Sequence, residues 1–329
     1  MEFDFATHRR LAPGSDNWPV TWADDDNLYA AWGDGGGFGG SNSSGRVLLG
    51  IARIEGDAAN ATGKNVWGGF APEHPAQFGG KSYGILCVDG VLYLWVAPQP
   101  NPHLANCRIA FSKNHGATWE FAEWKFAFAE GLTVPTFLNF GRDYAGARDD
   151  YVYSYYIQPQ WGPGIATRTT AHTFDVHRPG RIHLSRVPKD AILDRTRYEF
   201  FAGVDPATRQ PRWSPDLAKK QPVFADPNGV GWNVSVTCNA GLGRYLLTTE
   251  HSETHTGKLG LFDAPEPWGP WTTIAYDEAW GSGHVEVSTF HWVFTPKWMS
   301  ADGTQFTMIF TGKNSNDSFN TVAGRFVRR

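Results

Sequence analysis

The sequence predicts an all-β protein that folds as a five-bladed β-propeller of antiparallel sheets. One observation is a unit that recurs about every 65 residues of the 329-residue chain: a β-rich run, a polar turn and a second β-rich run. Another is that a third β-rich run follows most of these pairs, with an outer fourth run after two of them. The composition agrees, since 41% of the residues are hydrophobic, 15 residues are Trp and only 19% are charged. Three or four antiparallel strands per unit, five times over, indicate a propeller.

Each unit begins with a hairpin. The clearest signal is Asp89-Gly90, because Asp-Gly between two β-rich runs is typical of a tight hairpin turn. The hairpins are expected at residues 18–34, 83–96, 135–157, 233–249 and 291–311. Third strands are expected at 45–54, 107–112, 181–186, 259–262 and 320–327, and outer fourth strands at 118–121 and 271–274.

The chain is expected to form one domain, residues 1–329, with an N-terminal segment that helps to close the ring. One short helix is expected at 188–198, between blades three and four, because Pro188 and Asp190 are typical of a helix start. The Gly-rich stretch 33–41 falls inside blade one and is therefore a loop. The predicted blades are approximately 15–75, 76–130, 131–215, 216–280 and 281–329.

Composition and charge exclude several classes of function. The net charge is −4 and the chain has no run of Lys or Arg, so no nucleic-acid partner is expected. No apolar stretch approaches the ~18 residues of a membrane span, so no membrane partner is expected. The three cysteines show no metal-ligand spacing, and no metal-site residue or required cofactor is predicted. Asp and backbone oxygens would nevertheless suit a structural Ca²⁺ on the propeller axis.

The expected state is a monomer with a carbohydrate partner. The first residues, Met1 to Phe5, do not resemble a signal peptide. The leading function acts on an extracellular polysaccharide, so the protein is expected to be secreted or periplasmic with its signal peptide removed. A cytoplasmic location is the alternative.

Strand polarity predicts where the functional residues gather. The first strand of each blade starts near the axis at one face, and the antiparallel second strand returns to that face. Polar residues just before first strands and just after second strands should therefore converge. The candidates for catalysis are Asp16, Asp34 and Glu250. The candidates for substrate binding are Asn17, Lys81, His103, Trp161, Trp232, Asn233, His251, His291 and Lys313, and Thr133 and Asp317 occupy equivalent positions.

This mixture of carboxylates, cations and aromatic rings suits a carbohydrate. Aromatic faces stack on sugar rings, and cleavage of a glycosidic bond needs two carboxyl groups, one of them with a raised pKa. Asp16 would act as base or nucleophile, and Asp34 or Glu250 as general acid. Each residue also has a structural alternative: Asp16 could cap a turn, Asp34 could fix the Gly-rich loop, and Glu250 could pair with a cation on the rim.

Several stretches resemble bacterial proteins of the DUF4185 type, among them Ser15-Asp-Asn-Trp-Pro-Val and Trp32-Gly-Asp34. The resemblance implies a five-bladed propeller that acts on carbohydrates. The group includes endo-D-arabinanases, which cleave furanoside polymers with paired carboxylates, and its recurring acidic positions correspond to Asp16 and Asp34. The other similar stretches are 81–84, 144–153, 186–192, 231–235 and 262–271.

Residues 112–119, Ser-Lys-Asn-His-Gly-Ala-Thr-Trp, resemble the Asp-box turn of sialidase-like propellers, with Asn114 at the position where Asp is usual. The resemblance implies a structural turn between outer strands, away from catalysis.

Four functions remain open on the sequence alone. The leading one is a glycoside hydrolase that cleaves a polysaccharide or oligosaccharide in the axial cleft. Carboxyl groups ~5 Å apart would then retain the anomeric configuration, and groups ~6.5–9.5 Å apart would invert it. The second is a polysaccharide lyase acting on a uronate, with a base among His103, His251, His291 and Tyr156 and with Lys81 neutralising the carboxylate. The third is a non-catalytic glycan-binding propeller, and a protein-interaction scaffold is a more distant fourth.

Overall fold

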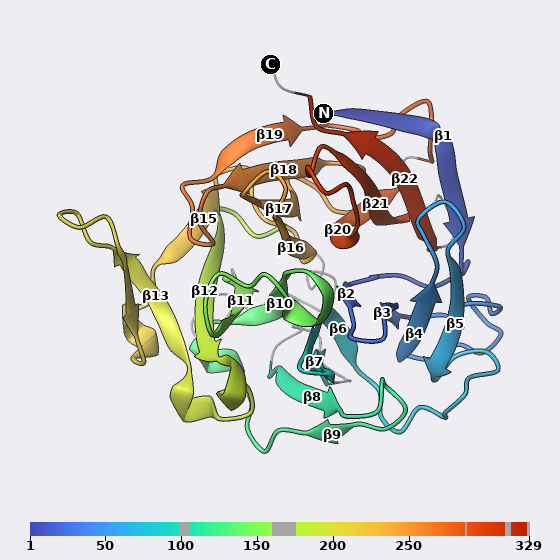
Figure 1. Ribbon diagram of the computed structural model, residues 1–329, viewed down its shortest axis with the longest axis horizontal. Coiled ribbons are helices and arrows are strands. Elements are labelled where there is room, and N and C mark those ends of the chain that lie inside the picture. Colours follow the sequence, from blue (N-terminus) through green and yellow to red (C-terminus); the bar gives the residue numbers. More distant parts are fainter. Residues whose placement is uncertain (99–105, 160–175, 287, 313–316, 328–329) are drawn as a thin grey trace.

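The computed structural model shows an all-β propeller (Figure 1), and the predicted fold class is confirmed. The structure describes residues 1–98, 106–159, 176–286, 288–312 and 317–327. Among these residues the only helical segments are short 3₁₀ turns, and no helix is long or apolar enough to cross a membrane.

The strands fall into successive antiparallel groups, which are called blades one to five. Blade three also includes the hairpin of β13 (Glu199–Val204) and β14 (Pro211–Ser214), and its strand β12 (Gly180–Pro188) pairs with β15 (Pro222–Asp226) as well. Blade one comprises β2 (Val20–Trp22), β3 (Leu28–Gly33), β4 (Leu49–Glu55) and β5 (Thr62–Trp67). Blade two comprises β6 (Lys81–Val88), β7 (Val91–Ala97), β8 (Arg108–Ser112) and β9 (Glu120–Phe121). Blade three comprises β10 (Thr133–Asn139), β11 (Tyr151–Ile157), β12 (Gly180–Pro188), β13 (Glu199–Val204), β14 (Pro211–Ser214) and β15 (Pro222–Asp226). Blade four comprises β16 (Val234–Asn239), β17 (Arg244–Glu250), β18 (Leu259–Ala264) and β19 (Thr272–Tyr276).

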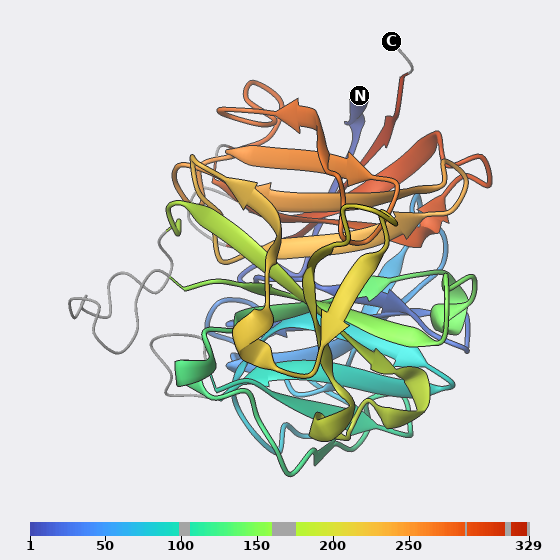
Figure 2. The same cartoon turned by 90° about the vertical axis from the view of Figure 1, so that its left-hand side faces the viewer.

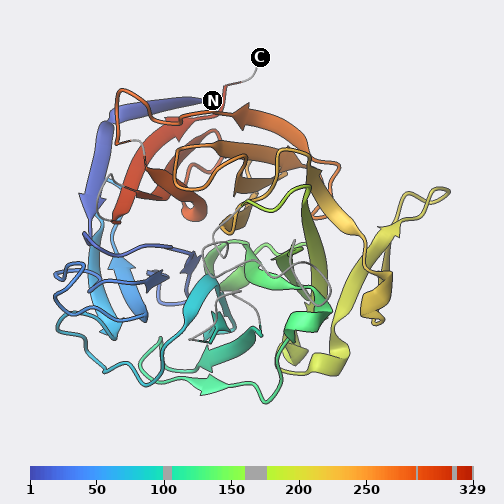
Figure 3. The ribbon, with the colours of Figure 1, turned by 180° about the vertical axis from the view of Figure 1, so that it is seen from behind.

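Blade five combines the two ends of the described chain. It consists of β20 (Thr289–Met299), β21 (Gln305–Gly312), β22 (Phe319–Arg325) and the N-terminal strand β1 (Glu2–Leu11), which pairs antiparallel with β22. Strand β1 and the end of β22 therefore lie side by side at the outside of this blade, as the view from behind also shows (Figure 3).

The innermost strands surround a common centre (Figure 1). Strand β2 contacts β6, β6 contacts β10, β10 contacts β16, β16 contacts β20, and β20 returns to β2. Strands β10 and β16 also form a short parallel pair at Leu138↔Val236 and Asn139↔Thr237, which joins blades three and four into one ten-stranded sheet. The ring is thus closed.

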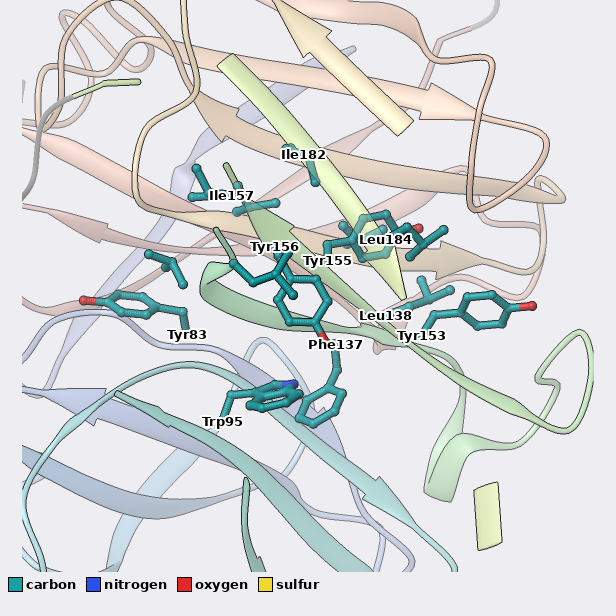
Figure 4. Packing of buried hydrophobic residues seen from close by; sticks show 14 of the residues in the cluster. Tyr83, Trp95, Phe137, Leu138, Tyr153, Tyr155, Tyr156, Ile157, Ile182 and Leu184 are labelled. Atoms are coloured by element: carbon teal, nitrogen blue, oxygen red, sulfur yellow. The ribbon is translucent and has the colours of Figure 1, made fainter. Parts of the chain in front are cut away.

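Inner strands are buried on both faces because each blade packs against two neighbours. Every residue of β6 is buried, which explains its continuous apolar run in place of an alternating pattern. Large aromatic rings fill the wedge between blades two and three, where Trp95 lies 5.8 Å from Phe137 and 6.0 Å from Tyr156 between ring centroids (Figure 4). Edge-on and offset contacts of this kind stabilise a core beyond the area that they bury.

The predicted helix at 188–198 is wrong. Residues Lys189–Ala191 and Arg195–Arg197 form two separate 3₁₀ turns, and they connect β12 to β13 inside blade three, not blade three to blade four. The Asp194 side chain accepts hydrogen bonds from the Thr196 backbone N–H (2.9 Å) and hydroxyl (2.7 Å). Such side-chain bonds compete with a continuing helix and favour turns.

The turn at 112–119 lies between β8 and β9 and is held by its own side chains. Ser112 Oγ donates to Asn114 Oδ1 (2.9 Å) and accepts from the Gly116 N–H (2.9 Å), while Asn114 Oδ1 also accepts from the Thr118 N–H (3.0 Å). The indole N–H of Trp119 donates to the Gly116 carbonyl (3.0 Å). These bonds fix a turn far from the axis.

Truncation of Trp95 should show how strongly the blades depend on this packing. Trp95→Ala removes a side chain that is 1% exposed, and we expect it to lower the free energy of unfolding by about 3–5 kcal/mol. The measurement is urea denaturation followed by fluorescence. Leu48→Ala is the matched control, since Leu48 is 46% exposed and should cost under about 0.5 kcal/mol. Equal effects of the two substitutions would contradict the role of the wedge.

Candidate functional site

Buried polar atoms gather where the inner strands begin. The backbone of the sheet does not provide hydrogen-bond partners for these side chains. Among the described residues, several of their polar atoms have no hydrogen-bond partner. Buried polar groups are normally paired with protein or with water, so this end of the axis is the place where water or a ligand would meet the chain. The atoms are Asp16 Oδ1, Asn17 Oδ1, Tyr83 OH, Thr133 Oγ1, Asn233 Oδ1, Thr289 Oγ1 and both ring nitrogens of His291. We call this end the axial face.

Backbone pairing in blade one brings Asp16 and Asp34 to the axial face together. The Asp16 N–H donates to the Gly33 carbonyl (2.9 Å), and the Gly33 N–H donates to the Asp16 carbonyl (2.7 Å). Asp34 follows Gly33 directly, in a left-handed conformation with φ of 45°. The sequence prediction that these two carboxylates converge therefore matches where the structure places them.

Lys81 joins this pair from the start of β6. Its Nζ lies 2.7 Å from Asp34 Oδ2, and Arg46 Nη2 lies 3.3 Å from Asp34 Oδ1. A Cβ on residue 33 would stand 2.7 Å from Asp16 Oδ1 and 3.0 Å from Lys81 Nζ. Glycine at this position is therefore needed for the Asp16 carboxylate and the Lys81 ammonium to approach each other.

A third carboxylate, Asp317, completes the group. Burial raises the pKa of Asp16 well above its ordinary value; the Lys81 charge opposes this shift, and the Asp317 and Asp34 charges reinforce it. Burial also raises the pKa of Asp317, with Asp34 adding to the effect. Three carboxyl groups thus share two cations, Lys81 and Arg46, in a partly desolvated site. The group can hold a proton at a pH where isolated carboxylates would be ionised.

Glu250 stands at the end of β17 in a different environment. Its side chain is buried, Oε1 accepts a hydrogen bond from the His255 N–H (2.8 Å), and Oε2 accepts a long one from Asn233 Nδ2 (3.4 Å). No cation among the described residues forms an ion pair with it. Burial therefore dominates and raises the pKa of Glu250 to about 7, although both hydrogen bonds oppose the shift.

Tyr83 and Trp232 lie between the two groups of residues. Burial raises the pKa of the Tyr83 hydroxyl, and the negative charges of Asp16 and Asp34 reinforce this effect. The Tyr83 ring also meets Trp232 edge-on at 5.5 Å, and Trp232 lies 5.2 Å from His255. Figure 4 shows the Tyr83 hydroxyl pointing away from the other labelled core side chains.

The predicted histidines differ in their surroundings. His251 follows Glu250 but turns to the outside of the blade, where its ring stacks on Tyr276 at 3.8 Å and its nitrogens approach Ser252 Oγ and the Asp277 carbonyl, each at 3.0 Å. It does not belong to the axial group. His291 is buried at the start of β20, where burial lowers its pKa to about 3, so its ring is neutral.

Four of the predicted binding residues lie close to the catalytic candidates: Asn17, which is a hydrogen-bonding neighbour of the Asp16 carboxylate, Lys81, Trp232 and Asn233. His103, Trp161 and Lys313 lie outside the described residues.

Sequence reasoning missed Arg46, Tyr83 and His255. Tyr83 could have been found, because it lies two residues after Lys81 on β6 and thus on the same face of the strand, whereas Arg46 and His255 lie in loops that carry no strand signal.

Among the described residues, Asp24, Asp25 and His115 bring their potential ligand atoms close enough together to hold a cation. Asp24 and Asp25 lie in the β2–β3 turn, at the opposite end of blade one from the axial face, and His115 lies in the β8–β9 turn of blade two. All three already have partners. His115 Nε2 lies 2.8 Å from Asp24 Oδ1, and Asp25 Oδ2 accepts from Asn27 (2.9 Å) and Tyr29 (2.9 Å). The Ca²⁺ on the axis stays a prediction.

Residues 86–279 match the family described as domain of unknown function DUF4185. This match covers more than half of the chain. The protein belongs to the DUF4185 family. A comparison with curated proteins finds no similar sequence.

Several solved structures with the same fold carry the names of glycoside hydrolases. The GH43_1 enzyme from Xanthomonas citri has a TM-score of 0.51 at 14% identity, with 98% of this chain and 90% of that chain covered. An endo-1,4-beta-xylanase from Bacteroides thetaiotaomicron has a TM-score of 0.51 at 14% identity, covering 95% and 91%. A thermostable family-43 glycoside hydrolase has a TM-score of 0.54 at 12% identity, covering 96% and 91%. At this identity the likeness establishes the propeller fold of this DUF4185 protein.

The raised pKa of Glu250 should make stability depend on pH. Between pH 4.5 and about 7 the folded protein keeps a proton that the unfolded chain releases. The folded state is therefore favoured most below pH 4.5, and this stabilisation, on the order of 3 kcal/mol, is lost as the pH rises through 7. Glu250→Gln should flatten the decrease in unfolding free energy between pH 5 and pH 8.

The control is Glu253→Gln, three residues away on an exposed side chain, which should keep the wild-type slope. The Asn233 amide can rotate to present its unpartnered Oδ1 to the new amide, so Glu250→Gln should fold. A wild-type slope in Glu250→Gln would contradict the buried, proton-holding state.

Proposed function

We propose that this DUF4185 protein is a glycoside hydrolase that cleaves a polysaccharide or oligosaccharide at the axial face, with Glu250 as general acid and Asp16 as general base or nucleophile. The observation that carries the proposal is the contrast between the carboxyl groups. Glu250 has no cationic partner among the described residues and a pKa of about 7. Burial also raises the pKa of Asp16, but there the Lys81 charge opposes the shift, and Lys81 and Arg46 both bind the neighbouring Asp34.

The assignment of the acid follows from the neighbours of each group. A general acid must hold its proton near the working pH, which a buried carboxyl without a cation does. Asp34 has Lys81 at 2.7 Å and Arg46 at 3.3 Å, and an ion-paired carboxylate is a poor proton donor. We therefore choose Glu250 over Asp34 as the acid and give Asp34 the role of holding Lys81 beside Asp16.

Asp16 suits the second role because one of its oxygens is buried and unpartnered, and because its raised pKa makes the ionised carboxylate a stronger base. In a hydrolysis that inverts configuration, Asp16 would accept a proton from the attacking water while Glu250 protonates the departing sugar oxygen. In one that retains configuration, Asp16 would itself attack the anomeric carbon, and Glu250 would then take a proton from the water that releases the product. Lys81 stabilises the charged form of Asp16 in either case.

The contacts give less support to the lyase alternative. A lyase needs a free cation for the substrate carboxylate and a base at the cleft. Lys81 is already bound to Asp34, His251 faces the outside of blade four, and the Tyr156 hydroxyl is bonded to Ser185 Oγ (2.9 Å) within the core. The solved propellers of the same fold are named as glycoside hydrolases, which agrees with the hydrolase.

A panel of polysaccharides should separate the functions. We expect new reducing ends without the ultraviolet absorbance of an unsaturated uronate. Reducing ends with that absorbance would identify a lyase, and binding without either product would identify a glycan-binding protein; both outcomes contradict the proposal.

Variants of the two carboxyl groups should lose turnover while keeping the fold. Asp16→Asn and Glu250→Gln should each lower kcat by about 10²–10⁴-fold, as measured on the substrate found in the panel, with melting curves as the check on folding. Glu253→Gln is the matched control and should retain wild-type kcat. Full activity of either catalytic variant would remove its assigned role.

The pH profile and the leaving group should identify the acid. Because Glu250 must be protonated, kcat/KM should fall as the pH rises above about 7. Glu250→Gln should lose this limb. It should also recover most of its activity on an aryl glycoside whose leaving group needs no protonation, whereas Asp16→Asn should not. Equal losses on both kinds of substrate would show that Glu250 does not act as the acid.

A further inference from the structure

A groove at the outer edge of blades three and four has no part in the site described above. It has a volume of about 650 Å³, which lies within the range of small-ligand sites. Its walls are the β13–β14 hairpin and the connection between β18 and β19. Figure 2 shows this hairpin, in yellow, in front of the ring. The residues that line the groove include Arg209, Arg212, Glu266 and Trp268.

The groove opens on the face opposite the axial face. Third strands run away from the axial face, because first strands start there and neighbouring strands are antiparallel. Strand β18 therefore ends at the opposite face, where the 265–270 connection begins, and β12 ends there before the chain enters β13. A ligand in the groove would not touch Asp16 or Glu250.

The surrounding segment is basic in an acidic protein. Residues 176–222 contain ten Lys or Arg and five Asp or Glu, a net charge of +5, whereas the whole chain has a net charge of −4. Several of these cations already have partners, such as Arg186 with Glu199 and Arg195 with Glu130, both at 2.8 Å. The excess positive charge must be matched elsewhere, by solvent ions or by a ligand.

Arg209 and Arg212 are the cations that line the groove, and neither forms an ion pair with a described residue. Both side chains are exposed. Asp205 is near enough to Arg212 to interact with its charge, but it forms no ion pair with it, and one Asp205 oxygen accepts from the N–H groups of Ala207 (3.0 Å) and Thr208 (2.9 Å). The two guanidinium groups therefore keep donors for an anion, and arginine matches the geometry of a carboxylate.

Trp268 adds an aromatic surface. Arg148 lies over its ring at 4.5 Å, and Trp213 meets it edge-on at 6.0 Å, so the indole is held in place. The carboxylate of Glu266, which also lines the groove, forms an ion pair with Arg148. The negative charge in the groove is thereby neutralised, and it does not oppose an anionic ligand.

We propose that this groove is a second glycan-binding site, selective for a polysaccharide whose sugars carry carboxylates. Arg209 and Arg212 bind the carboxylates, and Trp268 packs against a sugar ring. Binding here does not require hydrolysis at the axial face, and the site would hold an acidic chain on the far side of the propeller. The exposed cations and the aromatic ring together distinguish it from a simple basic patch.

Affinity electrophoresis with polygalacturonate tests the proposal without relying on turnover. The wild-type protein should be retarded by polygalacturonate at low salt, and the effect should weaken as salt screens the charges. Arg209→Gln with Arg212→Gln should weaken binding about tenfold. Lys113→Gln with Lys125→Gln removes the same charge from exposed positions on blade two and should change binding less than twofold.

Two comparison polymers isolate the chemistry. Dextran, a neutral glycan, and poly-glutamate, a carboxylate polymer without sugar rings, should both bind at least tenfold more weakly than polygalacturonate. Absence of retardation by polygalacturonate, equal losses in the two double variants, or equal binding of poly-glutamate would each overturn the proposal. None of these outcomes bears on the role of Glu250, so the two proposals fail separately.

Discussion

The direction of the inner strands constrains everything else in the molecule. Strands β2, β6, β10, β16 and β20 lie around one centre and start at one face. Among the described residues, backbone hydrogen bonding between them is confined to the short β10–β16 pair. Side-chain packing therefore holds the ring, and the wedge between blades is filled with rings such as Trp95 and Phe137. Polar groups that cannot enter this packing collect at the strand starts, where they are buried without sheet partners.

Burial at the axial face has two different outcomes for carboxylates. Asp34 is held by two cations, whereas Glu250 is held by one backbone N–H and one amide. Desolvation raises the pKa of Glu250 and the pKa of Asp16, but only at Asp16 does a nearby cation, Lys81, oppose the shift. The neighbouring residues therefore distinguish two carboxyl groups that are both buried at one face. The same reasoning makes the outer groove different, since its cations lie in solvent and no buried charge needs compensation.

Much of the fold and part of the site could be predicted from the sequence. Asp89-Gly90 and the continuous apolar run of β6 carry local signals, and strand polarity then placed Asp16, Asp34, Lys81 and Glu250 at one end of the axis. A helix was predicted at 188–198 because Pro188 and Asp190 match a helix start. The hydrogen bonds of Asp194 and the short path from β12 to β13 favour turns there instead. His251 was expected at the axial face beside Glu250, but consecutive strand residues face opposite sides, and His251 lies against Tyr276 instead. Arg46 reaches Asp34 from a loop, and no local pattern reports such a contact.

The pairing of β1 with β22 has a consequence for how the chain reaches this structure. Residues 2–11 are made before blades one to four, but their partners, residues 319–325, are made after these blades. The edge of β1 therefore waits unpaired while the intervening blades emerge, and contacts so distant in sequence form slowly. Blade five is then the last to be completed during synthesis on the ribosome, and the ring stays open until it is. An exposed strand edge in that interval is the point at which a nascent chain of this kind is most open to chaperones and to mispairing.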